Sequence, residues 1–363
     1  MTPAPPATDA VAEPSPVAAA IVDRDDQAPE GVDPRRRRST LGIVIVSFNT
    51  RDLLAACLDS LRAEIDGAGL AATVHVVDNA SDDGSAAMVA ERFPWVSLTV
   101  LPANRGFTAG NNVLLGPWAR SDAGSPDWAL LLNPDTEVRP GALQALLAAA
   151  DADPRVAVAG PALVYPDGRF QHAAFAFPGI LQAALDLFPP RGRPGARLLE
   201  SRLNGRYSRR LYRSGRPFEV DFVLGACLLA RTAAMRQVGP LDEGYFMYAE
   251  EVDWCRRFAR AGWRRVCVPA AVVLHHGGAA SSQFRARSWS TLWRSRRRYL
   301  RRQEPAWRAA VVDLLLRGAV GRLRRDDARA AASGLLGADE RALREAAYAA
   351  ALAPLDAETG DGR

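Results

Sequence analysis

Short apolar runs alternate with amphipathic segments along most of this chain, and this alternation is what most constrains its fold. Residues 43–46 form a continuous β-branched run, which is typical of a strand buried on both faces, and residues 51–63 follow with helical periodicity. The alternation predicts an α/β fold whose sheet is mostly parallel and doubly wound, with helices on both faces. The expected strands are 43–46, 73–77, 97–101, 128–132, 156–159 and 220–224, with another ending at 275, and the expected helices are 51–63, 84–92, 109–119, 140–150 and 249–261.

Composition divides the chain into three parts. Residues 1–39 begin rich in Ala, Pro and acids and end in a basic run, which predicts a disordered tail. Residues 40–282 carry the strand and helix alternation and are expected to form the main domain. Within it, the alternation becomes irregular over residues 165–218, which are rich in Pro, Gly and Arg. We expect a long, partly mobile insertion near a binding cleft there. Residues 283–363 are expected to form a basic helical extension.

The bulk numbers describe an ordinary globular protein. Of 363 residues, 48% are hydrophobic and 24% charged, and all 46 basic residues are Arg. The four cysteines form no C-x-x-C pair, which argues against a structural zinc site and a disulfide framework. No signal peptide and no apolar stretch of about 20 residues is apparent. A cytoplasmic protein is therefore expected.

The extension interleaves Arg with Trp, Tyr and Leu over residues 287–302 and continues as an amphipathic segment over 307–323. This pattern fits helices lying on the inner face of an anionic membrane. Helices packed on the main domain with a solvated Arg face explain it equally well. RNA binding is a weaker alternative, and no nucleic-acid partner is expected.

Polar residues follow the predicted strands. Asn133-Pro134-Asp135 comes directly after the apolar run 128–132. Pro134 ends the strand, and ligands in open α/β sheets gather at the carboxyl ends of strands. We therefore expect Asp135 to project into a crevice there. A carboxylate at that place suits a hard divalent cation, which in turn suits a substrate phosphate.

The first two strands end in similar polar segments. Ser47 and Asn49 follow the first strand, and Asp78 and Asn79 follow the second, where an acid can bind a ribose hydroxyl or a base edge. No G-x-G-x-x-G follows the first strand, which disfavours a nicotinamide cofactor. An N-cap and turn explains Asp78-Asn79 equally well, and it is the better explanation for residues 81–84.

Residues 104–112 (NRGFTAGNN) are rich in Gly and Asn. A plain loop explains the glycines but not Phe107 between them. A wall packed against a nucleotide and its sugar explains both.

In order and spacing, these segments resemble the family-2 glycosyltransferases, and most closely the bacterial rhamnosyltransferase-type enzymes of cell-wall and polysaccharide assembly. The resemblance spans about residues 42–282 and includes 221–231 and 241–257. It implies a GT-A nucleotide-sugar-binding fold. It also implies a nucleoside site at Ser47, Asn49, Asp78 and Asn79, and a pyrophosphate and sugar site at Asn104, Gly106, Phe107, Asn112 and Asn133.

The resemblance further implies the reacting groups. Asp135 matches the last acid of the family's metal-binding Asp-x-Asp motif, and His275 matches a position near the metal or diphosphate, so Mg²⁺ or Mn²⁺ is the implied cofactor. Glu251 matches the catalytic base, with Glu250 and Asp253 as competitors on the same helical turn. Asp221, Gly225 and Ala226 would shape the junction of donor and acceptor. His276 is expected to be structural.

The expected function is an inverting glycosyltransferase with a nucleoside-diphosphate sugar donor and a lipid-linked or polysaccharide acceptor of the cell envelope. Rhamnose on thymidine diphosphate is the specific expectation, at the inner face of the cell membrane. UDP-galactofuranose or a UDP-hexose is the alternative donor. A catalytically silent nucleotide-sugar-binding scaffold is the rival from another class, and a nucleotidyltransferase is a third.

Overall fold

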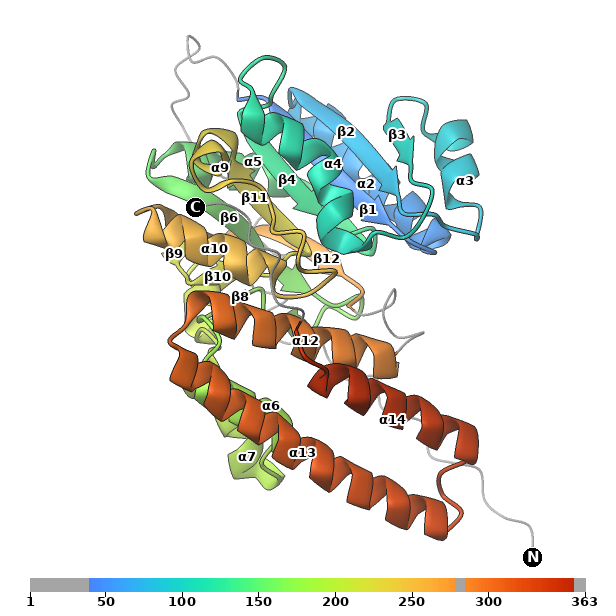
Figure 1. The fold of residues 1–363 in the computed structure, drawn as a ribbon. Coiled ribbons are helices and arrows are strands. Elements are labelled where there is room, and N and C mark those ends of the chain that lie inside the picture. The colour runs from blue at the N-terminus through green and yellow to red at the C-terminus, as the bar shows by residue number, and fades with distance from the viewer. Residues whose placement is uncertain (1–38, 278–284, 356–363) are drawn as a thin grey trace, which may run out of the picture.

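A computed structural model describes residues 39–277 and 285–355. The predicted disordered tail lies outside these residues except for Ser39, so it stays a prediction. The chain folds into an α/β domain with helices packed below it (Figure 1).

The central sheet has the strand order β3-β2-β1-β4-β11-β6-β12-β5. Its parallel half contains β1 (Leu41–Ser47), β2 (Ala72–Asp78), β3 (Ser97–Val100) and β4 (Trp128–Leu132). Every residue of β1 and β4 is buried, as their unbroken apolar sequences predict. The mixed α/β architecture with a mostly parallel sheet is therefore confirmed.

The other half of the sheet is mixed rather than parallel. The β11 strand (Cys227–Arg231) is antiparallel to both β4 and β6 (Val156–Val164), and β5 (Thr136–Val138) is antiparallel to β12 (Arg264–His275). Only β6 and β12 pair in parallel here. The predicted strand 220–224 is only a two-residue strand, β10 (Phe222–Val223), which pairs with β8 (Ala174–Phe175) outside the central sheet, while β9 (Phe218–Glu219) before it pairs with β12.

Helices cover both faces of the sheet. One group contains α2 (Arg51–Ala68), α3 (Ser85–Arg92) and α5 (Ala142–Asp151), and the other contains α4 (Gly106–Arg120), α9 (Thr232–Val238) and α10 (Glu250–Arg260). Contacts run within each group and to the strands beneath it. This layering leaves the carboxyl ends of β1, β2 and β4 at one edge of the domain (Figure 1).

The insertion is more regular than predicted. Residues 165–218 form β7 (Phe170–Gln171), β8, α6 (Ile180–Leu187), α7 (Gly192–Leu199), the 3₁₀ turn Arg202–Asn204 and α8 (Arg209–Arg213). The amphipathic α6 packs against a helix of the extension, so the apolar residues scattered among Pro and Arg are buried by a distant partner.

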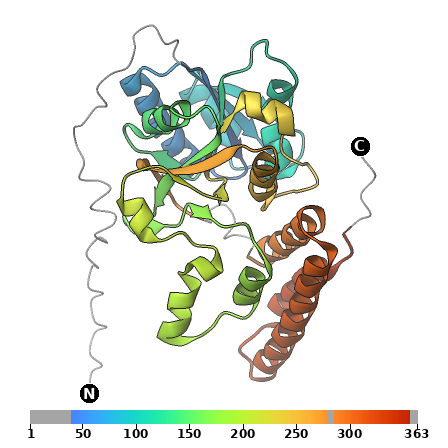
Figure 2. The same cartoon turned by 90° about the vertical axis from the view of Figure 1, so that its left-hand side faces the viewer.

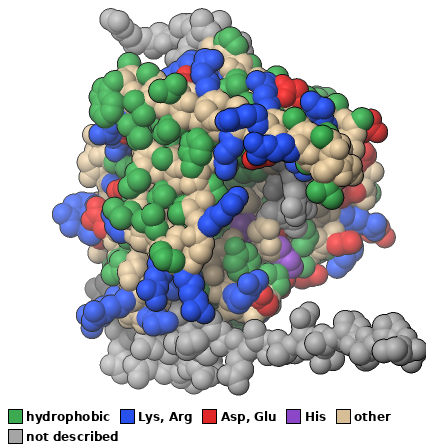
Figure 3. Space-filling model, turned by 90° about the horizontal axis from the view of Figure 1, so that it is seen from below, with side chains coloured by type: hydrophobic (Ala, Val, Ile, Leu, Met, Phe, Trp, Pro, Cys, Tyr) green, Lys and Arg blue, Asp and Glu red, His purple; other side chains and the backbone are tan. Residues whose placement is uncertain are grey.

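The extension consists of α12 (Arg285–Gln303), α13 (Ala306–Ala332) and α14 (Ala338–Leu352), which pack on one another below the sheet (Figure 2). Its helical character is as expected, and α12 also packs against α10. Within residues 39–277 and 285–355, no helix is long and apolar enough to cross a bilayer. From below, this side shows a hollow with histidine side chains inside it (Figure 3).

Candidate active site

The residues predicted at the strand ends share one edge of the sheet. Ser47, the last residue of β1, pairs in register with Asp78, the last residue of β2. On the other side of β1, β4 runs parallel and leads into Asn133. The Asn133 amide donates to the Ala226 carbonyl (2.9 Å), so the start of β11 lies beside the end of β4. The sheet thus brings residues from four separate segments to one crevice.

At the predicted nucleoside site, most polar atoms bind other protein atoms. The Ser47 and Thr50 hydroxyls are 2.9 Å apart, and Asn49, in the left-handed region at φ 52°, accepts through Oδ1 from the Asp82 amide (2.9 Å). Asp78 Oδ1 accepts from the Ser81 amide (2.9 Å), while its buried Oδ2 has no protein partner among the described residues. Asp78 Oδ2 is therefore the atom here best placed to accept a bond from a ligand.

Asn79 joins two segments of the protein. Its side-chain amide donates to Asn104 Oδ1 (3.0 Å) and the Gly106 carbonyl (3.1 Å), and its Oδ1 accepts from the Arg105 amide (2.9 Å). The residue is buried. With all of these positions occupied, Asn79 fixes the end of β2 to the start of α4 and has little capacity left for a nucleoside.

Most of residues 104–112, for which a plain loop was one explanation, form the first turns of α4. Its Asn112 side chain donates to the Leu241 carbonyl (2.8 Å) and accepts from the Leu241 amide (3.2 Å). The Phe107 amide donates to the Phe246 carbonyl (2.8 Å), and a Cβ at Gly106 would lie only 2.4 Å from that oxygen. These contacts dock the segment 241–248 on α4, so Asn112 is held as a structural residue.

Asp135 and His275 lie together as predicted, both buried. His275 Nε2 is 3.5 Å from Asp135 Oδ1, and its Nδ1 lies 3.1 Å from Gln171 Oε1 in β7, a partner that the sequence did not suggest. The neighbouring His276 pairs instead with Glu137 (3.1 Å).

This pair fits a divalent cation only with help from a substrate. Among the described residues, no three His, Cys, Asp or Glu side chains group as a complete metal site. Mg²⁺ commonly binds through one or two carboxylates and completes its shell with substrate phosphates and water. Asp135 and His275 match such a partial set.

The candidate base lies where α10 begins. The two residues before the helix, Tyr248 and Ala249, both have positive φ angles (71° and 64°), which is rare for residues with a Cβ. Glu250 and Glu251 follow, and both are buried with their Oε2 atoms unpartnered within the described chain. A Cβ at Gly225 would lie 3.8 Å from Glu251 Cβ and Cγ, so Glu251 packs directly against the start of β11.

Burial, rather than the helix dipole, governs these two acids. It raises the pKa of Glu251 to about 7. Burial and the neighbouring Glu251 hold the pKa of Glu250 well above its ordinary value. Glu251 therefore titrates in the range that suits a general base.

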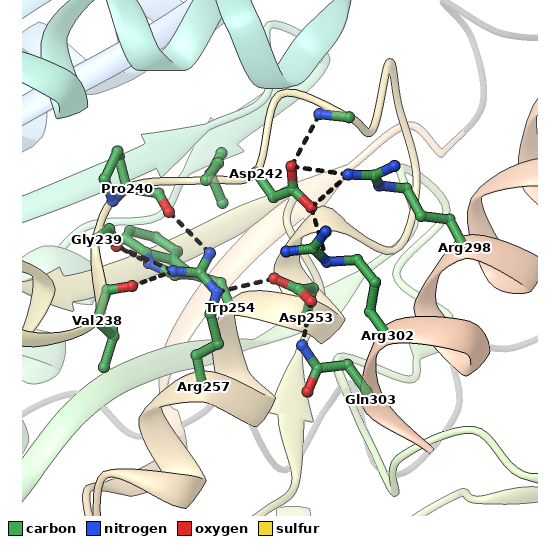
Figure 4. A network of polar contacts seen from close by, with 12 residues as sticks. Val238, Gly239, Pro240, Asp242, Asp253, Trp254, Arg257, Arg298, Arg302 and Gln303 are labelled. Atoms are coloured by element: carbon green, nitrogen blue, oxygen red, sulfur yellow. Dashed lines mark hydrogen bonds and ion pairs between the residues drawn. The ribbon is translucent and has the colours of Figure 1, made fainter. Parts of the chain in front are cut away.

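Asp253 has a different environment from the two glutamates (Figure 4). Its Oδ2 accepts from Arg257 Nε (2.8 Å) and its Oδ1 from Gln303 Nε2 in α12 (2.5 Å). Arg257 in turn donates to the Val238, Gly239 and Pro240 carbonyls. With both oxygens occupied by this network, Asp253 positions the segment before α10 and is a poor candidate for the base.

Asp221 contacts residues of the insertion. Its Oδ2 accepts from the Phe177 amide (2.9 Å), and its own amide donates to the Tyr207 hydroxyl (3.0 Å). Asp221 therefore anchors the insertion, whereas Gly225 and Ala226 lie beside Glu251 and Asn133.

Comparisons with known proteins agree on the class of this chain. Residues 42–233 match the family model for glycosyl transferase family 2. The chain is 34% identical over 290 residues to the Mycobacterium tuberculosis N-acetylglucosaminyl-diphospho-decaprenol L-rhamnosyltransferase, a match that covers 77% of this chain and 90% of that protein. The chain belongs to glycosyltransferase family 2 and is a rhamnosyltransferase-like member of it. It is thus a glycosyltransferase enzyme.

One further similarity covers a shorter stretch of the chain, and another has a lower sequence identity. Escherichia coli rhamnosyltransferase WbbL is 34% identical over 84 residues, which is 23% of this chain and 32% of that protein. The structure of a mannosyltransferase from Pyrobaculum calidifontis with GDP-Man and Mn²⁺ covers 92% of this chain and 91% of its own, at 16% identity and a TM-score of 0.48.

The raised pKa of Glu251 predicts how stability depends on pH. Between its ordinary pKa and about 7, the folded protein keeps a proton that the unfolded chain releases, so stability falls as pH rises through this window. Glu251→Gln removes the ionisation. We expect its Tm to exceed that of the wild type by about 2 °C or more at pH 8 and the two values to converge near pH 5. Differential scanning calorimetry at both pH values measures this, and an equal gap at both would contradict the assignment.

Proposed function

We propose that this enzyme transfers rhamnose from a thymidine-diphosphate donor to a hydroxyl of a lipid-linked N-acetylglucosamine, with inversion at the anomeric carbon. One structural observation supports the proposed arrangement of the reacting groups. The Asn133 amide, two residues before Asp135, donates to the Ala226 carbonyl, and the neighbouring Gly225 packs against the candidate base, which supports the proposal. Support for the sugar and acceptor comes from the name of the 34% identical mycobacterial relative, which specifies L-rhamnose and an N-acetylglucosaminyl-diphospho-decaprenol.

In the proposed reaction, the Glu251 carboxylate accepts the proton of the acceptor hydroxyl as that oxygen bonds to the anomeric carbon. The bond from that carbon to the diphosphate oxygen breaks, and the electron pair leaves with the nucleoside diphosphate. Burial and the neighbouring Glu251 raise the pKa of Glu250, which disfavours a second negative charge beside the base. Positioning of both substrates lowers the barrier as well, because it replaces a bimolecular encounter.

We assign the donor to the strand-end crevice. Asp78 Oδ2 would accept a bond from the nucleoside, and Asp135 with His275 would hold Mg²⁺ or Mn²⁺. The cation, when bound, would neutralise charge on the departing diphosphate. Asn79 and Asn112 would act indirectly, by fixing the segments around the donor.

We further propose that the helical side of the molecule rests on the inner face of an anionic membrane. On α13, Trp307 and Leu314 lie on one exposed face, 58% and 70% exposed, together with Arg317. Exposed apolar residues among arginines are typical of helices that insert shallowly into such a surface. The view from below shows hydrophobic and Arg side chains beside the hollow (Figure 3).

A donor panel with the wild type and Glu251→Gln tests the function. Wild-type protein should yield a rhamnosylated lipid-linked N-acetylglucosamine by mass spectrometry, and its kcat/KM should fall below about pH 7 as Glu251 gains a proton. The variant should lose about 10² to 10⁴-fold in turnover and keep its donor affinity. A product from UDP-galactofuranose or a UDP-hexose alone would reassign the donor. Full turnover by the variant would remove Glu251 from the mechanism.

Replacing Asp135 with Ala tests the cation site. Loss of a direct ligand should weaken binding of thymidine diphosphate in the presence of Mn²⁺ by about 10-fold or more, and calorimetry with and without the metal measures it. Asp122→Ala, which removes an exposed acid elsewhere, serves as the control. Equal metal-dependent affinity in wild type and Asp135→Ala would contradict this role.

Substitution of Trp307 and Leu314 by Glu tests the membrane proposal. The double variant should bind phosphatidylglycerol vesicles at least about 10-fold more weakly in a sedimentation assay, because it loses two apolar contacts and adds negative charge. Val100→Glu changes an equally exposed apolar residue on β3 and should bind as the wild type does. Unchanged vesicle binding by the double variant would refute the assignment of this face.

A further inference from the structure

A second cavity, of about 310 Å³, lies between the start of α12 and the segment 241–248. None of its lining residues belongs to the strand-end crevice. The wall formed by α12 carries Arg287, Thr291, Arg294 and Arg298, which recur at intervals of four, three and four residues. Helix geometry places such residues on one face, so the cavity has an arginine stripe along one side. Phe246 lies on the opposite wall.

Two arginines of this stripe have no carboxylate partner among the described residues. Arg287 is exposed, and neither it nor Arg294 forms an ion pair with a carboxylate within residues 39–277 and 285–355. Arg294 donates to the Ala350 carbonyl (3.3 Å). Arg298 pairs with Asp242, its Nη2 lying 3.0 Å from Oδ2 (Figure 4). Asp242 also pairs with Arg302. The cavity therefore suits an anion.

The cavity is separated from the candidate base by a few residues of one segment. Ser295 in its wall donates to the Met247 carbonyl (2.8 Å), three residues before Glu250. Phe246 uses its carbonyl to hold the Phe107 amide at the start of α4. An anionic group in the cavity would thus belong to the substrate on the acceptor side of Glu251, because the donor phosphates are assigned to Asp135 and His275.

We propose that this cavity binds the diphosphate of the lipid-linked acceptor, an inference that rests on the proposed function. Arg287 and Arg294 supply planar donors that match phosphate oxygens in pairs, and Thr291 adds a hydroxyl. The acceptor sugar then extends toward Glu251, while the lipid leaves along the helical side of the molecule. The cavity selects acceptors that carry a diphosphate over acceptors with the same sugar on a neutral lipid.

The test compares two acceptors, N-acetylglucosaminyl diphosphate on a farnesyl chain and octyl N-acetylglucosaminide. In the Arg287→Ala/Arg294→Ala variant, the ratio of kcat/KM between them should fall about 10-fold or more, as expected for lost hydrogen bonds to a charged group, with KM for the donor unchanged. Arg341→Ala, which removes an exposed arginine from α14, should keep the wild-type ratio. An unchanged ratio in the double variant, or a raised donor KM instead, overturns the proposal.

A binding measurement separates this proposal from the proposed function. Farnesyl diphosphate, titrated calorimetrically, should bind the wild type and Arg341→Ala equally and the double variant about 10-fold more weakly. If wild-type protein transfers no sugar to either acceptor yet shows this difference, the proposed function fails and the cavity assignment stands. Equal farnesyl diphosphate binding by wild type and double variant refutes the cavity assignment, whatever the enzymatic result.

Discussion

The site depends on the antiparallel pairing of β11 with β4. In an all-parallel sheet, the segment after β4 and the segment before the next strand would lie at opposite ends. Because β11 runs the other way, its first residues meet the last residues of β4, and the Ala226 carbonyl accepts from the Asn133 amide. Gly225 then leaves room for Glu251 to pack against the backbone. One reversed strand thus sets the end of β4, which leads to Asp135, beside the segment against which Glu251 packs.

A second set of contacts holds the segment that precedes Glu251, the candidate base. The segment 238–249 is tied to α4 through Asn112 and Phe107, to α10 through Arg257, and to α12 through Asp242 and Ser295. Asp253 links two of these ties, since it binds both Arg257 and Gln303. The extension is therefore part of the framework of the active site. Loss of α12 would free the residues that precede Glu251.

The sequence was a good guide to elements whose environment is uniform. Fully buried strands such as β1 and β4 appear as unbroken apolar runs, and α10 shows helical spacing. It failed at β11, because a short apolar run such as CLLA does not distinguish a strand from a helix. The predictions of site residues also succeeded in some cases and failed in others. The meeting of Asp135 with His275 followed from the family resemblance, but the partners of Asn79 and Asn112, and the Gln303 partner of Asp253, lie 25 or more residues away and leave no local signal.

The adjacent left-handed residues Tyr248 and Ala249 have a consequence for how the enzyme meets its substrates. Each such residue costs on the order of 1 kcal/mol, so the conformation persists only because the surrounding contacts impose it. The free energy of folding already includes this conformational cost before any sugar binds. On the proposed assignment of Glu251 as the base, its backbone is therefore preorganised, and little reorganisation energy would remain to be supplied when the acceptor hydroxyl arrives.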